Sequence, residues 1–244
     1  MRAIALISVP LCGVALILAG GSPRAALGWA LLGAGVVQLA VGVFYMRSGM
    51  FGRVREHVAP GTIALTYDDG PDGKTTPRLL DLLAEHGAKA TFFVIGEHVR
   101  AHPEIVKRCV AEGHAIGNHS DRHSYLTNFF LRGRMRREMR ACQEAVRAAA
   151  GVEPRFYRPP IGLMNPAVVP AARDLGMEVV AWSIRSLDTR RGDPVRRVVP
   201  RLRSRAIVLL HDGGLEPERV LETTRRILDA ARERDLAAVA IPVD

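Results

Sequence analysis

The chain has 244 residues, of which 48% are hydrophobic and 24% are charged, a balance that excludes a disordered or a fibrous protein. Three cysteines are too few for a disulfide-stabilised scaffold or a four-cysteine zinc ribbon. The formal net charge is +9, but no nucleic-acid-binding motif accompanies the basic residues. We therefore expect a folded protein with no nucleic-acid partner, and nothing in the sequence indicates an obligate protein partner.

Two uncharged apolar stretches, residues 3–21 and 25–46, open the chain. An α-helix rises about 1.5 Å per residue, so each stretch could cross a hydrocarbon core about 30 Å thick. A cleaved signal peptide is the alternative for the first stretch, but its charged start is Arg2 alone and a second apolar stretch follows at once. We predict a membrane anchor of two transmembrane helices over residues 1–46, which makes the chain an integral protein of the cell (inner) membrane.

The arginines that flank the two stretches favour one orientation. With both ends of the hairpin in the cytoplasm, Arg2, Arg47, Arg53 and Arg55 lie inside and Arg24 lies outside. Basic residues are enriched in cytoplasmic loops, so this count favours a cytoplasmic globular part. The side of the membrane otherwise stays open.

Strand-like and helix-like segments alternate from residue 62 onward, after a linker at 47–61 that is rich in Arg and Gly. The predicted strands are 62–69, 90–95, 115–119, 156–160, 178–184, 206–211 and 236–243. The predicted helices are 76–86, 103–112, 127–150, 166–175, 194–203 and 216–234, and most of them end at a glycine. Seven strands alternating with helices predict a parallel α/β fold over residues 62–244, either a closed barrel or an open sheet.

Uncommon polar residues gather where these strands end. They are Asp68 and Asp69 after the first strand, His119 and His123 after the third, Arg158 after the fourth, Asp188 after the fifth and His211 after the sixth. The carboxyl ends of parallel strands share one edge of a sheet, where active sites of such folds lie. These side chains are therefore expected to form one site.

His119 and His123 are four residues apart, so on one helical turn they would project the same way. Such a spacing alone is commonly a coincidence, but Asp69 at another strand end adds a carboxylate. Two histidines and one carboxylate with an open position are typical of catalytic zinc and iron sites. We predict that Asp69, His119 and His123 bind one divalent metal ion, with zinc the first choice.

Asp68 lies beside these ligands and could act as a general base toward the attacking water. A polar turn is the competing interpretation of Asp68 and Asp69, but two adjacent aspartates after a buried apolar strand are unusual. His211 could be a general acid that donates a proton to a leaving amine. Asp188 could pair either with His211 or with Arg158, and both pairings stay open.

Arg158 precedes two prolines that hold the backbone extended. Its guanidinium could hold Asp68 in position. The backbone N–H of Ile161 could point at a developing oxyanion.

Five ordered motifs carry a family resemblance: TYDDGP at 66–71, NHSDRH at 118–123, RPPIG at 158–162, WSIRSLD at 182–188 and LLHD at 209–212. Through them the chain resembles the NodB-homology polysaccharide deacetylases, carbohydrate esterase family four, over about residues 60–244. The resemblance implies a distorted (β/α) barrel that removes an N-acetyl group from a sugar, usually with zinc.

The resemblance also assigns roles. It implies that Asp68 is the base, that Asp69, His119 and His123 hold the metal, and that His211 is the acid. It implies that Leu209 lines an acetyl pocket, and we expect Tyr67 and Ile161 to belong to the same oxyanion and substrate pocket.

Two positions depart from the family pattern. Ile161 stands where an aromatic residue is usual, and Thr189 stands where Trp usually follows the aspartate of the fourth motif. Both changes remove flat surface on which a sugar could stack. We therefore expect a substrate whose shape differs from that of a long polysaccharide.

Taken together, the sequence predicts a metal-dependent hydrolase that removes an N-acetyl group from an N-acetylated sugar in a glycan or in a lipid-linked saccharide. The alternative is a catalytically inactive, membrane-anchored glycan-binding protein, which would not need all of the polar residues at the strand ends. The Arg-rich segment 132–140 could contact anionic headgroups of membrane lipids or be a solvated basic face. The identity of the sugar, and whether the acyl group is acetyl or formyl, stay open.

Overall fold

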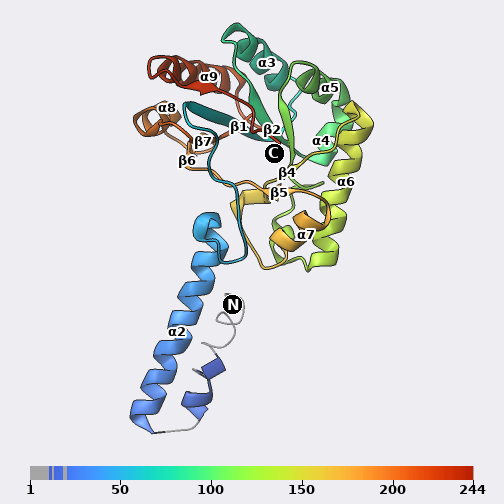
Figure 1. Ribbon diagram of the computed structural model, residues 1–244. Coiled ribbons are helices and arrows are strands. Elements are labelled where there is room, and N and C mark those ends of the chain that lie inside the picture. Colours follow the sequence, from blue (N-terminus) through green and yellow to red (C-terminus); the bar gives the residue numbers. More distant parts are fainter. Residues whose placement is uncertain (1–10, 13, 19–20, 244) are drawn as a thin grey trace.

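The computed structural model describes residues 11–12, 14–18 and 21–243 and consists of a long N-terminal helix attached to an α/β domain (Figure 1). Helix α2, Ser22–Phe44, runs away from the domain, and a short turn of 3-10 helix, η1 (Met46–Ser48), joins the two. Among the described residues, α2 is the one helix long and apolar enough to cross a membrane. Most of the first predicted span, 3–21, lies outside the described residues, so a pair of spanning helices stays a prediction.

Parallel strands form the centre of the domain. Their bounds are Thr62–Gly70 (β1), Ala90–Val94 (β2), Ala115–Asn118 (β3), Phe156–Tyr157 (β4), Glu178–Val179 (β5), Ile184–Arg185 (β6), Ile207–His211 (β7) and Ala237–Ala238 (β8). The order is β5-β4-β3-β2-β1-β7-β6, and β8 pairs with the start of β1. The parallel α/β prediction is confirmed, but β5 and β6 stand at opposite ends of the path, so the strands form a half-barrel and not a closed one.

The gap in the half-barrel is filled by the segment expected to be a linker. The N–H of Arg55 donates to the carbonyl of Val179, and the N–H of Ala181 donates to the carbonyl of Arg55. His57 forms a further bridge to Ala206, and Val58 is buried. The stretch 47–61 is therefore part of the domain, because it satisfies backbone groups that the short strand β5 leaves exposed.

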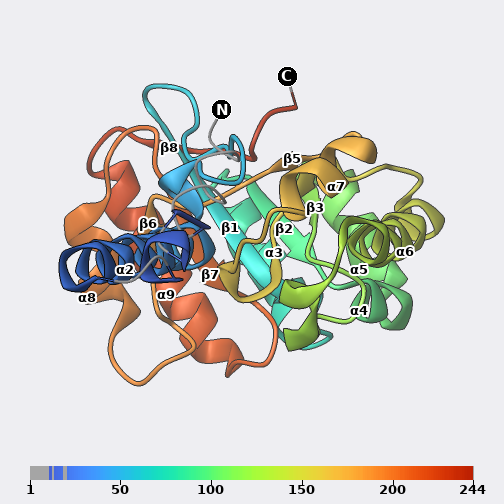
Figure 2. The ribbon, with the colours of Figure 1, turned by 90° about the horizontal axis from the view of Figure 1, so that it is seen from below.

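Helices pack against the outer face of the half-barrel, with α8 and α9 next to β6 and β7 and α4, α5 and α6 beyond β3 (Figure 2). Their bounds are Thr75–Glu85 (α3), Gly96–Ala101 (α4), Pro103–Ala111 (α5), Arg132–Ala150 (α6), Val168–Asp174 (α7), Pro194–Val198 (α8) and Pro217–Arg232 (α9); the 3-10 turns are Tyr125–Phe129 (η2), Pro160–Gly162 (η3) and Val199–Arg201 (η4).

Several predicted bounds were wrong. The predicted helix 127–150 is two elements, because the backbone is extended at Phe130 and Leu131 between η2 and α6. In place of the strand predicted at 178–184 the structure has two short strands, β5 and β6, and in place of the strand predicted at 236–243 it has only β8. The short helix α4 was not predicted.

The alternation of side chains between the two faces of β1 determines which of them reach the site. Leu65 and Tyr67 belong to the core beneath the helices, together with Phe92 of β2. Ala64 packs with Phe93 on the concave side of the half-barrel. Since successive side chains of a strand point to opposite faces, Thr66 and Asp68 share the concave side with Ala64.

Candidate active site

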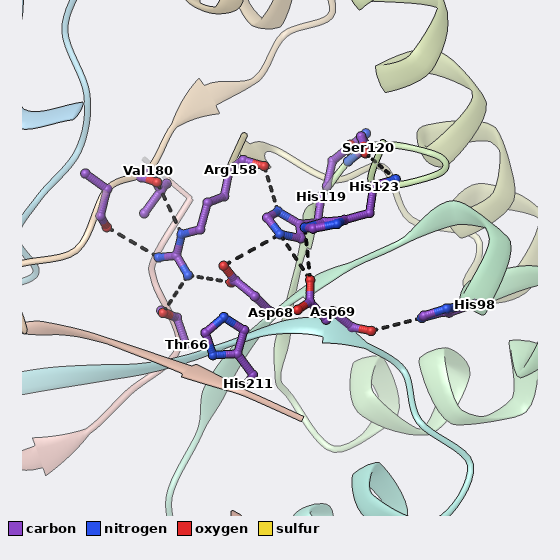
Figure 3. A network of polar contacts seen from close by, with 12 residues as sticks. Thr66, Asp68, Asp69, His98, His119, Ser120, His123, Arg158, Val180 and His211 are labelled. Atoms are coloured by element: carbon purple, nitrogen blue, oxygen red, sulfur yellow. Dashed lines mark hydrogen bonds and ion pairs between the residues drawn. The ribbon is translucent and has the colours of Figure 1, made fainter. Parts of the chain in front are cut away.

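The carboxyl ends of β1, β3, β4 and β7 bring six of the predicted site residues into one cluster (Figure 3). The six are Asp68, Asp69, His119, His123, Arg158 and His211. Polar side chains far apart in the sequence thus meet at the edge of the sheet, as the strand-end pattern predicts.

Asp69, His119 and His123 form a compact group. Oδ1 of Asp69 lies 3.4 Å from Nε2 of His119 and 3.3 Å from Nε2 of His123. The three ligand atoms lie within 4.8 Å of one another. The two histidines do not share a helical turn: they lie in a loop in which Ser120 and His123 have positive φ angles of 68° and 50°. The expected convergence is present, but this loop and not a helix produces it.

The donor atoms of this group suit a divalent cation. Oδ1 of Asp69 is buried and has no hydrogen-bond partner among the described residues. Although burial opposes ionisation, the contacts with His119 and His123 hold the pKa of Asp69 well below its ordinary value. Nδ1 of His119 is hydrogen-bonded to the carbonyl oxygen of Arg158 at 2.8 Å, which leaves Nε2 to face the cation. An unpaired anionic oxygen between two imidazole nitrogens therefore fits a metal ion.

A buried ion pair holds Asp68. The guanidinium of Arg158 donates through Nη1 to Oδ1 of Asp68 at 2.6 Å and to Oγ1 of Thr66 at 2.8 Å. Arg158 is fully buried, and its guanidinium lies 4.0 Å from the centre of the Phe93 ring. The other oxygen of Asp68, Oδ2, lies 3.8 Å from Nε2 of His119. Asp68 thus has one oxygen fixed by Arg158 and the other directed at the candidate metal-binding group.

Asp188 pairs with His211 and not with Arg158, which resolves the alternatives left by the sequence. Nδ1 of His211 is 2.8 Å from Oδ1 of Asp188, and the backbone N–H of His211 donates to Oδ2 at 2.9 Å. Burial opposes the charged imidazolium, but this hydrogen bond and the charge of Asp188 raise the pKa of His211 to about 9. The raised pKa favours the protonated imidazole, in which Nε2 also carries a proton.

The predicted pocket residues separate into two groups. Ile161 is partly exposed and has a positive φ of 62°, and Leu209 is buried next to His211 on β7. Tyr67 is fully buried, its ring stacks on Phe92, and its hydroxyl bonds Thr224 of α9 at 2.9 Å. The structure does not place Tyr67 in the pocket, because its side chain points to the face of β1 opposite to Asp68.

Trp182, to which the sequence assigned no role, packs beside the site. A Cβ added at Gly162 would lie 2.2 Å from the Trp182 ring, so the turn of η3 and this ring are packed directly together. The ring also lies 5.7 Å from the Arg158 guanidinium. Trp182 opens the fourth motif, which was the available signal.

No role was predicted for Asp212 either, although it directly follows His211. It is fully buried, and its Oδ2 accepts a hydrogen bond from Thr76 at 2.6 Å. Burial raises its pKa to about 7.

Known proteins are similar to this chain in sequence. Residues 55–180 match the family model described as polysaccharide deacetylase. A peptidoglycan-N-acetylglucosamine deacetylase of Bacillus cereus is 36% identical over 187 residues, which cover 73% of this chain and 85% of that protein. A chitooligosaccharide deacetylase of Rhizobium leguminosarum is 40% identical over 154 residues, which cover 62% and 71% of the two chains.

A solved structure extends the comparison to the fold. A family 4 carbohydrate esterase from Streptomyces lividans, in complex with acetate, matches with a TM-score of 0.67 and 30% identity. The match covers 74% of this chain and 93% of the esterase. The chain therefore belongs to the polysaccharide deacetylase family, a family of hydrolases that act on the amide bonds of N-acetylated sugars.

Proposed function

We propose that the chain is a metal-dependent N-deacetylase of an N-acetylated sugar in a glycan or a lipid-linked saccharide. The observation that carries the proposal is the pairing of Asp68 with Arg158 and of His211 with Asp188 beside an Asp/His/His group. One pair holds a carboxylate that can accept a proton, and the other holds an imidazolium that can donate one. Amide hydrolysis needs both.

Each side chain has a definable part in the reaction. Bound by Asp69, His119 and His123, a divalent metal ion, with zinc the first choice, would supply positive charge to polarise the amide carbonyl. Oδ2 of Asp68 accepts the proton of the attacking water, while the hydrogen bond from Arg158 to Oδ1 holds the carboxylate in position.

The remaining steps concern the oxyanion and the amine. The N–H of Ile161 donates to the oxyanion as negative charge develops. Nε2 of His211 gives its proton to the departing amine, and Asp188 keeps the ring charged and aligned. Leu209 bounds the space for the acyl group.

We also propose that α2 anchors the domain in a membrane. An 18-residue window within its 23 residues has a mean hydropathy of 1.9, and only 17% of that window is buried. Leu27, Val37 and Phe44 are among its exposed side chains, whereas the core helix of a water-soluble domain would bury such residues. The proposed division is an anchor within residues 1–46, the packed stretch 47–61 and the deacetylase domain 62–244. The cytoplasmic side stays the prediction from the arginine count.

The full chain, purified in detergent, should contain about one divalent metal ion and should release acetate from N-acetylated chitooligosaccharides. His119→Ala should lose both properties, because it removes one of three ligands. His102→Ala, which changes a half-buried histidine outside the group, should keep both. Metal content is measured by elemental analysis and acetate by an enzymatic assay. A wild-type chain that binds the sugar but releases no acetate would support the glycan-binding alternative instead.

The dependence of kcat on pH should reveal the role of Asp188. His211 is protonated below its raised pKa, so activity should fall as the pH rises through that value. Asp188→Asn removes the charge that raises this pKa and should move the alkaline limb to lower pH. Asp193→Asn, in the same loop and at the N-terminus of α8, should leave the limb in place. An alkaline limb that Asp188→Asn does not move would contradict the pairing.

A further inference from the structure

An exposed apolar surface lies beside the candidate site. We call it the apolar rim and define it by Leu126 and Phe129 of η2 and by Leu131, which are 61%, 84% and 83% exposed. Contiguous exposed apolar side chains cost solubility, and in folded proteins they commonly mark an interaction surface. The neighbouring residue Phe130 is buried, so the segment is held in place while its other side chains point outward.

The apolar rim is attached to the place where α2 meets the domain. The side-chain amide of Asn165 donates to the carbonyl of Phe130 at 3.4 Å. One residue earlier, the N–H of Met164 donates to the carbonyl of Val43, near the end of α2, at 2.9 Å. The loop that follows η3 therefore joins the rim to the end of the proposed membrane helix.

A single apolar cluster fixes this arrangement. Met46, just after α2, belongs to the same buried cluster as Phe130 and Met164. In the ribbon, α2 leaves the domain on the side where α7 and the beginning of α6 lie (Figure 1). If α2 crosses a bilayer, the rim lies on the side of the domain that is next to the bilayer surface.

The charges around the rim match a lipid surface. Helix α6 begins directly after Leu131, carries Arg134, Arg137 and Arg140 as exposed side chains, and has no acidic residue in its first turn. The guanidinium of Arg134 lies 3.8 Å from the centre of the Phe130 ring. Leucine and aromatic side chains flanked by arginines are typical of segments that lie in the headgroup region, where arginine pairs with lipid phosphates.

The apolar rim also lies next to the candidate active site. Tyr125, the first residue of η2, comes two residues after the proposed ligand His123, and η2 lies against η3, which contains Ile161. A surface that contacts the rim therefore lies at the edge of the candidate active site.

We propose that the apolar rim inserts into the headgroup region of the membrane that α2 crosses, and that the substrate is an N-acetylated sugar linked to a lipid in that membrane. The choice of substrate rests on the proposed deacetylase activity, whereas membrane contact of the rim rests only on the proposed anchoring by α2. A sugar tethered to the bilayer surface would meet the site at a high effective concentration, whereas a free oligosaccharide would not.

Depth-dependent quenching tests the contact. A polarity-sensitive dye is attached to Phe129→Cys, and separately to Leu126→Cys, in the full chain carrying Cys12→Ser; Cys109 and Cys142 are buried and do not react. The chain is reconstituted into vesicles of phosphatidylcholine and phosphatidylglycerol with nitroxide-labelled acyl chains. Quenching is expected at both rim positions and not at Glu85→Cys, an exposed position at the end of α3. Rim dyes quenched no more than the Glu85 dye would overturn the proposal.

Substrate choice is tested by the triple variant Leu126→Ser, Phe129→Ser and Leu131→Ser. We expect kcat/KM for lipid-linked N-acetylglucosamine in vesicles to fall by about tenfold or more, because the tether no longer presents the sugar to the site. Activity on a soluble chitooligosaccharide should be unchanged. The matched control Val243→Ser removes an exposed apolar side chain elsewhere and should alter neither activity.

The outcomes separate the two proposals. Equal effects of the triple variant on both substrates would overturn the lipid-linked substrate. A wild-type chain that deacetylates neither substrate would overturn the proposed function and the substrate class with it, while quenching at the rim would still establish the membrane contact.

Discussion

Replacing Asp68 by Asn should lower kcat for an N-acetylated sugar by a factor of about 10² to 10⁴, the usual contribution of a general base. Asn has nearly the same shape and can still accept the hydrogen bond of Arg158, but it cannot take a proton from water. The metal ligands are untouched, so metal content should stay at the wild-type level. Acetate release and elemental analysis of the same preparation give both values.

The variant also removes the negative partner of a buried guanidinium. Loss of one partner of such a pair commonly costs about 3–5 kcal/mol, so the midpoint of thermal unfolding should fall while the protein stays folded at room temperature. Asp72→Asn is the matched control: this carboxylate accepts from the N–H groups of Lys74 and Thr75 at the start of α3, outside the site. Normal turnover by Asp68→Asn, or loss of its metal, would contradict the assignment of the base.

The long apolar runs and strand ends made much of the fold predictable. The runs at β1, β2 and β7 are buried on both faces, which is typical of parallel strands, and their positions were predicted closely. The packing of residues 47–61 was not predictable, because Arg55 pairs with Val179 and Ala181 far along the chain and carries no local strand pattern. Register and edge pairing depend on such distant contacts.

The site shows the same division between local and distant information. The grouping of Asp69, His119 and His123 could be predicted because each of them lies at or shortly after the end of a strand. Local periodicity could also have excluded Tyr67, since its neighbour Asp68 must face the other side of β1. The partner of Asp188 was undecidable from the sequence, because both His211 and Arg158 are distant residues and only the folded chain shows which is within reach.

His211→Ala should show which step needs this histidine. For an N-acetylated sugar, we expect kcat to fall by a factor of about 10² to 10⁴, because the amine cannot leave without a proton. For 4-nitrophenyl acetate the loss should be much smaller, since 4-nitrophenolate leaves as an anion and needs no acid. Acetate release and nitrophenolate absorbance measure the two reactions.

Asp68→Asn supplies the control for this comparison. Both substrates are attacked by water, so the loss of the base should slow both reactions, whereas the loss of the acid should slow mainly the amide. A His211→Ala variant that loses both activities equally would show that the residue does not serve as the acid. Because Asp188 holds His211 and Arg158 holds Asp68 through separate hydrogen bonds, the two substitutions should affect separate proton transfers. Their different substrate profiles would therefore assign one proton transfer to each pair.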